Sequence, residues 1–207
     1  MTHMKIGPKY KICKRLGASV FEKCQTQKFQ LAEARAPRKQ GKGKRGGGSD
    51  FGAQLLEKQK ARFTYGLSES QFARYVSEAM EKRGQDSVIG LMARLEARLD
   101  NVVFRSGFVK TRRAARQLVS HGHVTVNGRR VTIPSYDVKV GDKVAIRTES
   151  RQSPLFATRS EVAAETKLPE WLKMGGEHFE VAVEKLPGVA ETELPFNAGV
   201  VIQFYSR

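Results

Sequence analysis

Hydrophobic and polar residues follow two different periods along the 207-residue chain. Between residues 51 and 102, apolar side chains recur every three or four positions, which predicts amphipathic helices. Between residues 124 and 146, β-branched side chains alternate with polar ones, which predicts short strands. The pattern therefore indicates helices followed by a small, strongly twisted set of strands.

Cap and breaker residues set the ends of the first two expected helices. Ser49-Asp50 is a candidate N-cap, and the helix it starts should end at Gly66, because glycine breaks the pattern. Ser68 and Gln71 then have the spacing of a capping box, in which each residue satisfies a backbone N–H of the other.

The next apolar stretch predicts one further helix, from just after Asp86 to Gly107, which carries three arginines. Thr111 is the expected N-cap of the basic helix that follows. This helix places several cations on one short, rigid element, where they can meet phosphates.

Two turn signals divide the strand-forming stretch. Asn127-Gly128 is a strong hairpin signal because both residues tolerate the positive φ of the turn, and Gly141-Asp142 marks a second turn. The expected strands are the alternating pairs Val124 and Val126, Val131 and Ile133, Val138 and Val140, and Val144 and Ile146.

The last fifty residues are acidic to neutral and change character again. A short helix is expected over residues 160–167, and core or edge strands around Val181 to Leu186 and around Val200 to Ile202. We expect this tail to pack on the N-terminal helices or on a protein neighbour.

Charge is strongly uneven along the chain, whose formal net charge is +16. Residues 1–48 hold 13 Lys and Arg against 2 acidic residues, whereas residues 150–207 hold 6 against 8. Such a gradient indicates a polyanionic partner, and the alternative is a soluble protein with a basic surface. Residues 1–48 also include a Gly- and Lys-rich run without the spacing of a phosphate-binding loop, so we expect an arm that RNA orders and that is mobile in the isolated protein.

The sequence gives little support for a membrane span or for a metal site. No apolar run approaches the roughly 18–20 residues of a membrane span, and the first residues lack a signal-peptide core, so a cytoplasmic location is expected. Cys13 and Cys24 cannot fill a tetrahedral zinc site, even with His3, so we expect two free reduced thiols. His121 and His123 could bind a metal, but a C-cap and RNA-contact role or a plain surface role is expected.

Two groups of cations are the best candidates for contacts with RNA. Lys110, Arg112, Arg113 and Arg116 cluster around the start of the basic helix, where the helix N-terminus adds partial positive charge. Arg129-Arg130 follows the hairpin turn. A solvated basic face is the alternative for each group. Because the sequence has no row of aromatics for stacking bases, we expect the ligand to be a folded RNA junction and not a single strand.

The triplet Arg98-Leu99-Asp100 raises an enzymatic alternative, because an R-L-D triplet carries the catalytic aspartate of pseudouridine synthases. The following Asn101-Val102-Val103 lacks the Thr-Ser-Gly that is typical there, and about 60 residues after the RNA module are too few for that catalytic domain. We therefore interpret Asp100 as structural, paired with a nearby arginine.

Several stretches resemble one known family. RLDNVVFRSGF, TRRAARQLVSHGHVTVNGRRV and GDKVAIR are similar to the S4-type RNA-binding domain, which also occurs in other proteins. GPKYKICKR, GSDFGAQLLEKQKARFTYG and FYSR are similar to the bacterial small-subunit ribosomal protein S4 family itself, in the same order along the chain. Some members carry four zinc-binding cysteines, so the two present here resemble the metal-free form.

The resemblance implies an α+β fold: a helical domain built with both chain ends, and an inserted RNA-binding domain of two helices and a twisted antiparallel sheet. The expected boundaries are a basic arm at 1–48, a helical domain at 49–96, the RNA-binding domain at 97–157, and a segment at 158–207 that packs back on the helical domain. It also implies a structural, non-enzymatic protein of the small ribosomal subunit that binds the 5′ domain of its RNA early in assembly.

Implied partners are small-subunit ribosomal RNA, ribosomal protein S5 and other small-subunit proteins, and messenger RNA near its entry channel, with an influence on decoding accuracy. No cofactor, membrane or small-molecule substrate is expected. The alternative function is an RNA-modifying enzyme or a ribosome-associated factor that uses the same module. The candidate RNA-binding residues are Lys5, Lys9, Lys11, Lys14, Arg15, Lys42, Lys44, Arg45, Lys58, Lys60, Arg62, Arg94, Arg98, Arg105, Lys110, Thr111, Arg112, Arg113, Arg116, Gln117, His121, His123, Asn127, Arg129, Arg130, Tyr205 and Arg207.

Overall fold

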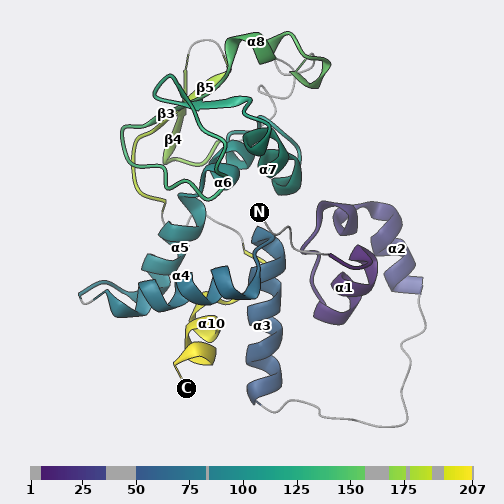
Figure 1. The fold of residues 1–207 in the computed structure, drawn as a ribbon. Helices are drawn as coiled ribbons and strands as arrows, with labels where there is room; N and C mark the ends of the chain where they lie inside the picture. Colours follow the sequence, from purple (N-terminus) through teal and green to yellow (C-terminus); the bar gives the residue numbers. More distant parts are fainter. Residues whose placement is uncertain are drawn as a thin grey trace. The chain divides into compact units, whose positions relative to one another are not determined.

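The chain forms two compact units, one of residues 1–88 with 193–207 and one of residues 89–192 (Figure 1). The structure is a computed structural model, and it describes residues 6–35, 50–82, 84–156, 168–175, 178–187 and 194–206. The first unit is helical and takes residues from both parts of the chain, whereas the second combines helices with an antiparallel sheet. The expected α+β fold, with one unit inserted into the other, is confirmed.

The helical unit holds its last helix beside a helix from the first third of the chain (Figure 1). Its elements are α1 (Lys9–Leu16), the 3-10 helix η1 (Glu22–Gln25), α2 (Gln27–Arg35), α3 (Asp50–Tyr65), α4 (Glu69–Glu81) and α10 (Ala198–Tyr205). The backbone N–H of Asn197 donates to Glu57 of α3 at 2.7 Å, and the rings of Phe204 and Phe51 lie 5.5 Å apart.

The expected strand around Val200 is wrong, because these residues form α10. The side chain of Asn197 accepts the N–H of Val200 at 3.2 Å and caps the helix. Val201 is fully buried in the helical unit, so tertiary packing and a cap override the β propensity of the valine–isoleucine run.

Residues 6–35 form a small helical cluster with its own core, where we expected an arm that orders against RNA and other contacts. Its centre holds Ile12, Leu16, Phe21 and Phe29, together with Phe63 of α3. Residues 36–49, which include the Gly- and Lys-rich run and the candidate cap Ser49, lie outside the described residues.

Cys13 of α1 and Cys24 of η1 form a disulfide in this cluster, so the expectation of two free thiols is wrong. The turn between the two helices brings their Cα atoms to 6.7 Å, although eleven positions separate them in sequence. Across the described ranges, no group of three or more His, Cys, Asp or Glu side chains could hold a metal ion.

The second unit is a sheet covered on one face by two helices. Its helices are α5 (Ser87–Glu96, which begins in the first unit), α6 (Leu99–Arg105), α7 (Arg112–Ser120), α8 (Thr148–Arg151) and the 3-10 helix η2 (Pro154–Phe156). Its strands are β1 (Val124–Val126), β2 (Arg129–Arg130), β3 (Lys143–Ile146), β4 (Leu172–Met174) and β5 (Glu180–Val183), in the order β2-β1-β3-β5-β4, with antiparallel neighbours.

Inward-facing valines of the sheet and apolar residues of α6 and α7 share one core. Val124 and Val126 are buried on either side of the part-exposed Thr125, so period-two alternation separates an inner face from an outer face. Within the described parts of the chain, no helix is long and apolar enough to cross a membrane.

The single helix expected from Asp86 to Gly107 is broken at Arg98, which has extended φ and ψ. Arg98 pairs with Asp137 in an isolated β-bridge, and the Ala97 carbonyl accepts the N–H of Val138 at 2.9 Å. The stretch from Val131 to Val140 therefore forms a loop around this break, and the strands expected there are wrong. A long-range backbone contact interrupts an apolar repeat that is continuous in sequence.

The tail divides between the two units, which corrects the expected boundary at residue 158. Strands β4 and β5 complete the sheet, with Val144 paired to Val181, whereas α10 packs on the helical unit. Leu186 follows β5 in a loop and is 65% exposed. The helix expected over residues 160–167 lies outside the described residues.

Candidate nucleic-acid interface

Helix α7 separates its polar residues onto two faces. Thr111 caps the helix as expected, because its hydroxyl accepts the N–H of Ala114 at 3.1 Å. Arg112 and Arg116 lie one turn apart on a half-buried face, whereas Arg113 and Gln117 lie one turn apart on an exposed face. The helical period therefore gives adjacent arginines different surroundings.

The half-buried pair is engaged within the unit. Arg112 donates through Nε to Asn101 Oδ1 at 2.9 Å, and its guanidinium lies 4.3 Å from the centre of the Phe104 ring. Arg116 donates through Nε and Nη2 to Asp100 Oδ2 at 2.9 and 2.8 Å. Both side chains therefore hold α7 against α6, and direct phosphate contact remains a prediction for them.

Two buried carboxylates organise the break between α5 and α6. Asp100, with a side chain 5% exposed, accepts from Arg98 at 3.0 and 2.7 Å as well as from Arg116. Glu96, with a side chain 1% exposed, accepts from Arg105 at 2.9 and 3.0 Å and from Asn101 at 2.7 Å. The expected arginine pairing of Asp100 is confirmed, and Arg98 and Arg105 are placed to shape this joint. Arg94 similarly pairs with Asp137 at 2.6 Å.

The exposed cations of this unit gather around the loop before α7 and the hairpin turn. Lys110, Arg113 and Arg129 are exposed, and no hydrogen bond or ion pair engages their side chains among the residues that the structure describes. The exposed Gln117 and His121 lie on the same helix and at its C-cap. These groups can offer charge and donors to a phosphate without first giving up an internal partner.

The hairpin turn is built as predicted. Asn127 and Gly128 have φ of 50° and 77°, and the Asn127 side chain donates to Asp142 at 2.7 Å and accepts the Lys143 N–H at 2.9 Å. Asn127 therefore locks this turn to the next one. The first of the two arginines that follow, Arg129, pairs with Val126 of β1.

The second hairpin arginine and the two histidines lie near the end of α7. Arg130 pairs with Thr125 and donates through Nη2 to the His121 carbonyl at 3.3 Å. His123 Nδ1 lies 2.9 Å from Ser150 Oγ, so this ring links β1 to α8. His121 is the C-cap residue of α7, as expected.

The helical unit shows a second set of exposed cations on α1. Lys11, Lys14 and Arg15 are exposed and lie on the face opposite Ile12, Cys13 and Leu16. Lys9 lies over the ring of Phe21, with 5.5 Å between Nζ and the ring centre. This basic face of α1 is available to an anionic ligand.

The candidate cations of α3 are instead paired within the unit. Glu69 accepts from Lys58 at 2.7 Å, from Arg62 at 2.9 Å and from the Tyr205 hydroxyl at 2.9 Å, and Lys60 pairs with Glu57 at 2.6 Å. Partial burial raises the pKa of Glu69, but the hydrogen bonds from Lys58 and Tyr205 and the nearby positive charges outweigh it, so the net pKa lies below 4.5. Burial and the contact with Glu69 raise the pKa of Tyr205.

Comparison with known proteins finds a family match in each of the two units. The family description "Ribosomal protein S4/S9 N-terminal domain" matches residues 4–96, and "S4 domain" matches residues 97–144. A small ribosomal subunit protein uS4 from Natranaerobius thermophilus is 42% identical over 205 residues, covering 97% of this chain and 98% of the relative. The chain belongs to the uS4 family.

Two other uS4 proteins show a similar match. The protein of Persephonella marina is 44% identical over 97% of this chain and 98% of its own length, and that of Thermus thermophilus is 41% identical over 98% of each. As a uS4-family member, the chain is an rRNA-binding structural protein of the small ribosomal subunit in the cytoplasm, and it is not an enzyme. The alternative of an RNA-modifying enzyme is thereby set aside, in agreement with the buried, arginine-bound position of Asp100.

Some candidate residues of this uS4-family chain cannot be placed, and two further cations were not among the candidates. Lys5, Lys42, Lys44, Arg45 and Arg207 lie outside the described residues. These two cations are Lys143 and Arg147, which flank Ala145 at alternate positions in GDKVAIR. The period of two in this strand could have indicated that both side chains share the outer face of the sheet.

Proposed function

We propose that this uS4-family protein binds the 5′ domain of small-subunit ribosomal RNA early in assembly and clamps a multi-helix junction there. The observation that carries the proposal is the set of exposed cations formed by Lys110, Arg113 and Arg129. The capped helix and the locked hairpin fix the backbone beside these groups, so their exposed side chains can reach phosphates from defined positions. Folded RNA is recognised mainly through its shape and backbone, which suits such a fixed constellation.

The basic face of α1 supports a protein that binds RNA through two separate basic surfaces. Lys11, Lys14 and Arg15 belong to the helical unit, whereas the cations around α7 belong to the inserted unit. Two basic surfaces on two folded units can engage different helices of one RNA, and their affinities multiply when both engage. Such bridging stabilises a junction before later proteins bind.

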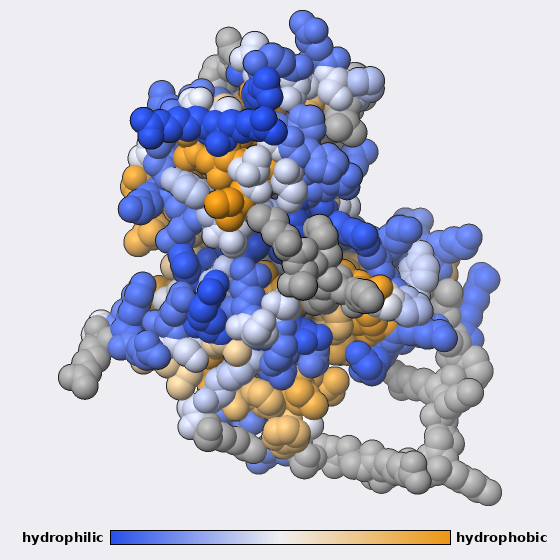
Figure 2. Space-filling view, viewed as in Figure 1, coloured by the Kyte–Doolittle hydropathy of each residue, from blue (hydrophilic) through white to orange (hydrophobic). Residues whose placement is uncertain are grey.

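A protein partner is also proposed, since an apolar surface lies over α3 and α10 in the helical unit. Phe51 is 51% exposed and Leu56 is 40% exposed, and apolar side chains gather there in Figure 2. A contiguous exposed apolar surface favours a protein contact. We propose ribosomal protein S5 as the neighbour, with messenger RNA close by and an influence on decoding accuracy, as the family resemblance suggests.

Binding to a transcript of the 5′ domain across a salt series tests the RNA part, with an unrelated structured RNA as competitor. Each phosphate contact should add roughly −0.7 to −0.9 to the slope of log K against log salt. Tight binding that survives the competitor is expected. Equal affinity for both RNAs would show that the protein binds RNA through its positive charge without specificity, and it would refute the assigned site.

A further inference from the structure

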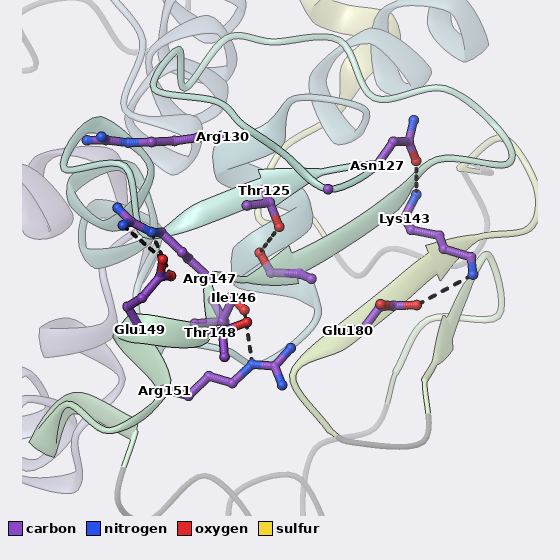
Figure 3. Close-up of a pocket in the computed structure, with 12 residues that line it drawn as sticks. Thr125, Asn127, Arg130, Lys143, Ile146, Arg147, Thr148, Glu149, Arg151 and Glu180 are labelled. Carbon is purple, nitrogen blue, oxygen red and sulfur yellow. Dashed lines mark hydrogen bonds and ion pairs between the residues drawn. The ribbon is translucent and has the colours of Figure 1, made fainter.

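Among the residues that the structure describes, helices α6 and α7 cover only one face of the sheet in the inserted unit. Helices α6 and α7 cover the inner face through the shared core, whereas Thr125 and Ala145 stand opposite each other on the outer face, with a hydrogen bond from Thr125 Oγ1 to the Ala145 carbonyl at 3.3 Å. A groove with a volume of about 600 Å³ lies over these small residues (Figure 3). We call it the outer-sheet groove, and residues of β1, the hairpin turn, β2, β3, β5 and α8 line it.

Basic side chains line the outer-sheet groove at both ends. Arg130 and Arg147 point toward one end and Lys143 lies at the other, with Arg151 below (Figure 3). The two carboxylates in the lining are already paired: Glu149 with Arg147 at 2.7 Å, and Glu180 with Lys143 at 3.8 Å. Both pairs are solvent-exposed, and such pairs contribute little to folding, so a stronger anion can replace the carboxylate.

The pair of Arg147 and Glu149 has the geometry of an anion site that its own chain fills. Arg147 donates through Nε to one carboxylate oxygen at 2.7 Å and through Nη2 to the other at 3.1 Å. This bidentate fork is the arrangement in which arginine also binds two oxygens of a phosphate. Glu149 therefore stands where a phosphate group of a ligand would stand.

The hairpin arginines show how RNA could reach both faces of the sheet. Arg129 shares the face of Val126 and Arg130 the face of Thr125, because successive residues of a strand point to opposite sides. The Arg130 side chain packs over Gly122, where an added Cβ atom would clash with its guanidinium, and its Nη2 donates to the His121 carbonyl. Because Gly122 has no side chain, Arg130 can lie against its backbone at the edge of the outer-sheet groove.

We propose that the outer-sheet groove binds the sugar–phosphate backbone of a second segment of ribosomal RNA, in which a phosphate displaces Glu149 from Arg147 and also meets Arg130. The inference rests on the proposed function, since it takes a folded ribosomal RNA as the ligand. None of the described residues that line the groove is aromatic, so backbone contact is favoured over stacking of bases. Cations at both ends of the groove suit an extended polyanion better than a single acidic side chain of a protein.

Charge-neutral variants of the full-length protein test the groove against the 5′-domain transcript. Arg147→Gln should weaken binding by about tenfold and make the salt slope shallower by roughly 0.7–0.9. Glu149→Gln should strengthen binding by roughly threefold, because it frees Arg147 from an exposed competitor. Lys82→Gln, an exposed residue of the helical unit, is the matched control for a lost surface charge. Unchanged thermal unfolding would establish that each variant folds.

Three outcomes would overturn the inference in distinguishable ways. If Arg147→Gln and Glu149→Gln bind as the parent does while Arg113→Gln binds more weakly, the proposed function stands and the groove does not bind RNA. If RNA binding is unchanged but Arg147→Gln enters small subunits poorly, a protein neighbour occupies the groove instead. If the parent protein itself prefers no RNA, the proposed function fails first.

Discussion

Each unit contains a carboxylate that accepts from several donors, but Asp100 of the inserted unit and Glu69 of the helical unit differ greatly in burial. In the inserted unit, Asp100 accepts from Arg98 and Arg116 with a side chain only 5% exposed. In the helical unit, Glu69 accepts from Lys58, Arg62 and Tyr205 with a side chain 44% exposed. The hydrogen-bonding pattern is similar, so the difference in burial decides how much each joint depends on its carboxylate.

The largest effect is expected from Asp100→Asn. Removing this charge leaves the Arg98 guanidinium, 4% exposed, without its carboxylate, and breaking a buried ion pair in this way typically costs about 3–5 kcal/mol. Urea unfolding of the full chain would measure the loss. Asp137→Asn is the matched control, because Asp137 is 49% exposed in its pair with Arg94 and its loss should cost little. Similar losses for the two variants would contradict the comparison.

A smaller effect is expected from Glu69→Gln. Solvent screens this half-exposed carboxylate, so its loss should lower the free energy of unfolding by only about 1 kcal/mol. Tyr205→Phe removes one of its donors and keeps the packed ring, so it should cost less than Glu69→Gln. A loss for Glu69→Gln as large as that for Asp100→Asn would show that burial is not the deciding factor.

The same carboxylate predicts how the helical unit responds to pH. The folded state lowers the pKa of Glu69 below 4.5, so the contribution is complete above pH 4.5 and disappears as pH falls through the depressed value. The raised pKa of Tyr205 acts at the other end: its contribution is complete below pH 10 and declines above it. The difference in unfolding free energy between the parent and Glu69→Gln should therefore shrink below pH 4.5, and a constant difference would contradict this account.

The smallest effect on stability is expected at Arg113, the exposed neighbour of a half-buried arginine. Arg113→Gln should change the free energy of unfolding by less than about 0.5 kcal/mol but weaken binding to the 5′-domain transcript. Arg112→Gln should cost more stability, because it removes the contacts with Asn101 and Phe104. The comparison fails if both variants lose stability equally.

Local signals in the sequence predicted the parts of the fold that local chemistry determines. Asn127-Gly128 forms the expected turn, Thr111 caps the expected helix, and Gly66 follows the end of α3 with a φ of 63°. Ser68 caps α4 as expected, but Gln71 donates to the Tyr75 hydroxyl, so only half of the capping box is present. Each of these features depends on residues within one turn of each other.

Features that depend on distant partners were not predicted. The break at Arg98 requires a bridge to Asp137, and the helix at Val200 requires packing against α3. Composition likewise predicted a basic surface, but it could not separate Arg113, which is exposed, from Arg116, which Asp100 binds. Only the fold shows which cations are used internally.

The contact between α10 and α3 has a consequence for biosynthesis. Asn197 and Glu57 are 140 positions apart, and the whole stretch of residues 89–192 is translated between the two helices. At roughly 5–20 residues per second, α3 waits on the order of ten seconds for its partner helix. The inserted unit can therefore fold first on the nascent chain, while Phe51 and its neighbours on α3 stay exposed to chaperones until the last helix leaves the ribosome.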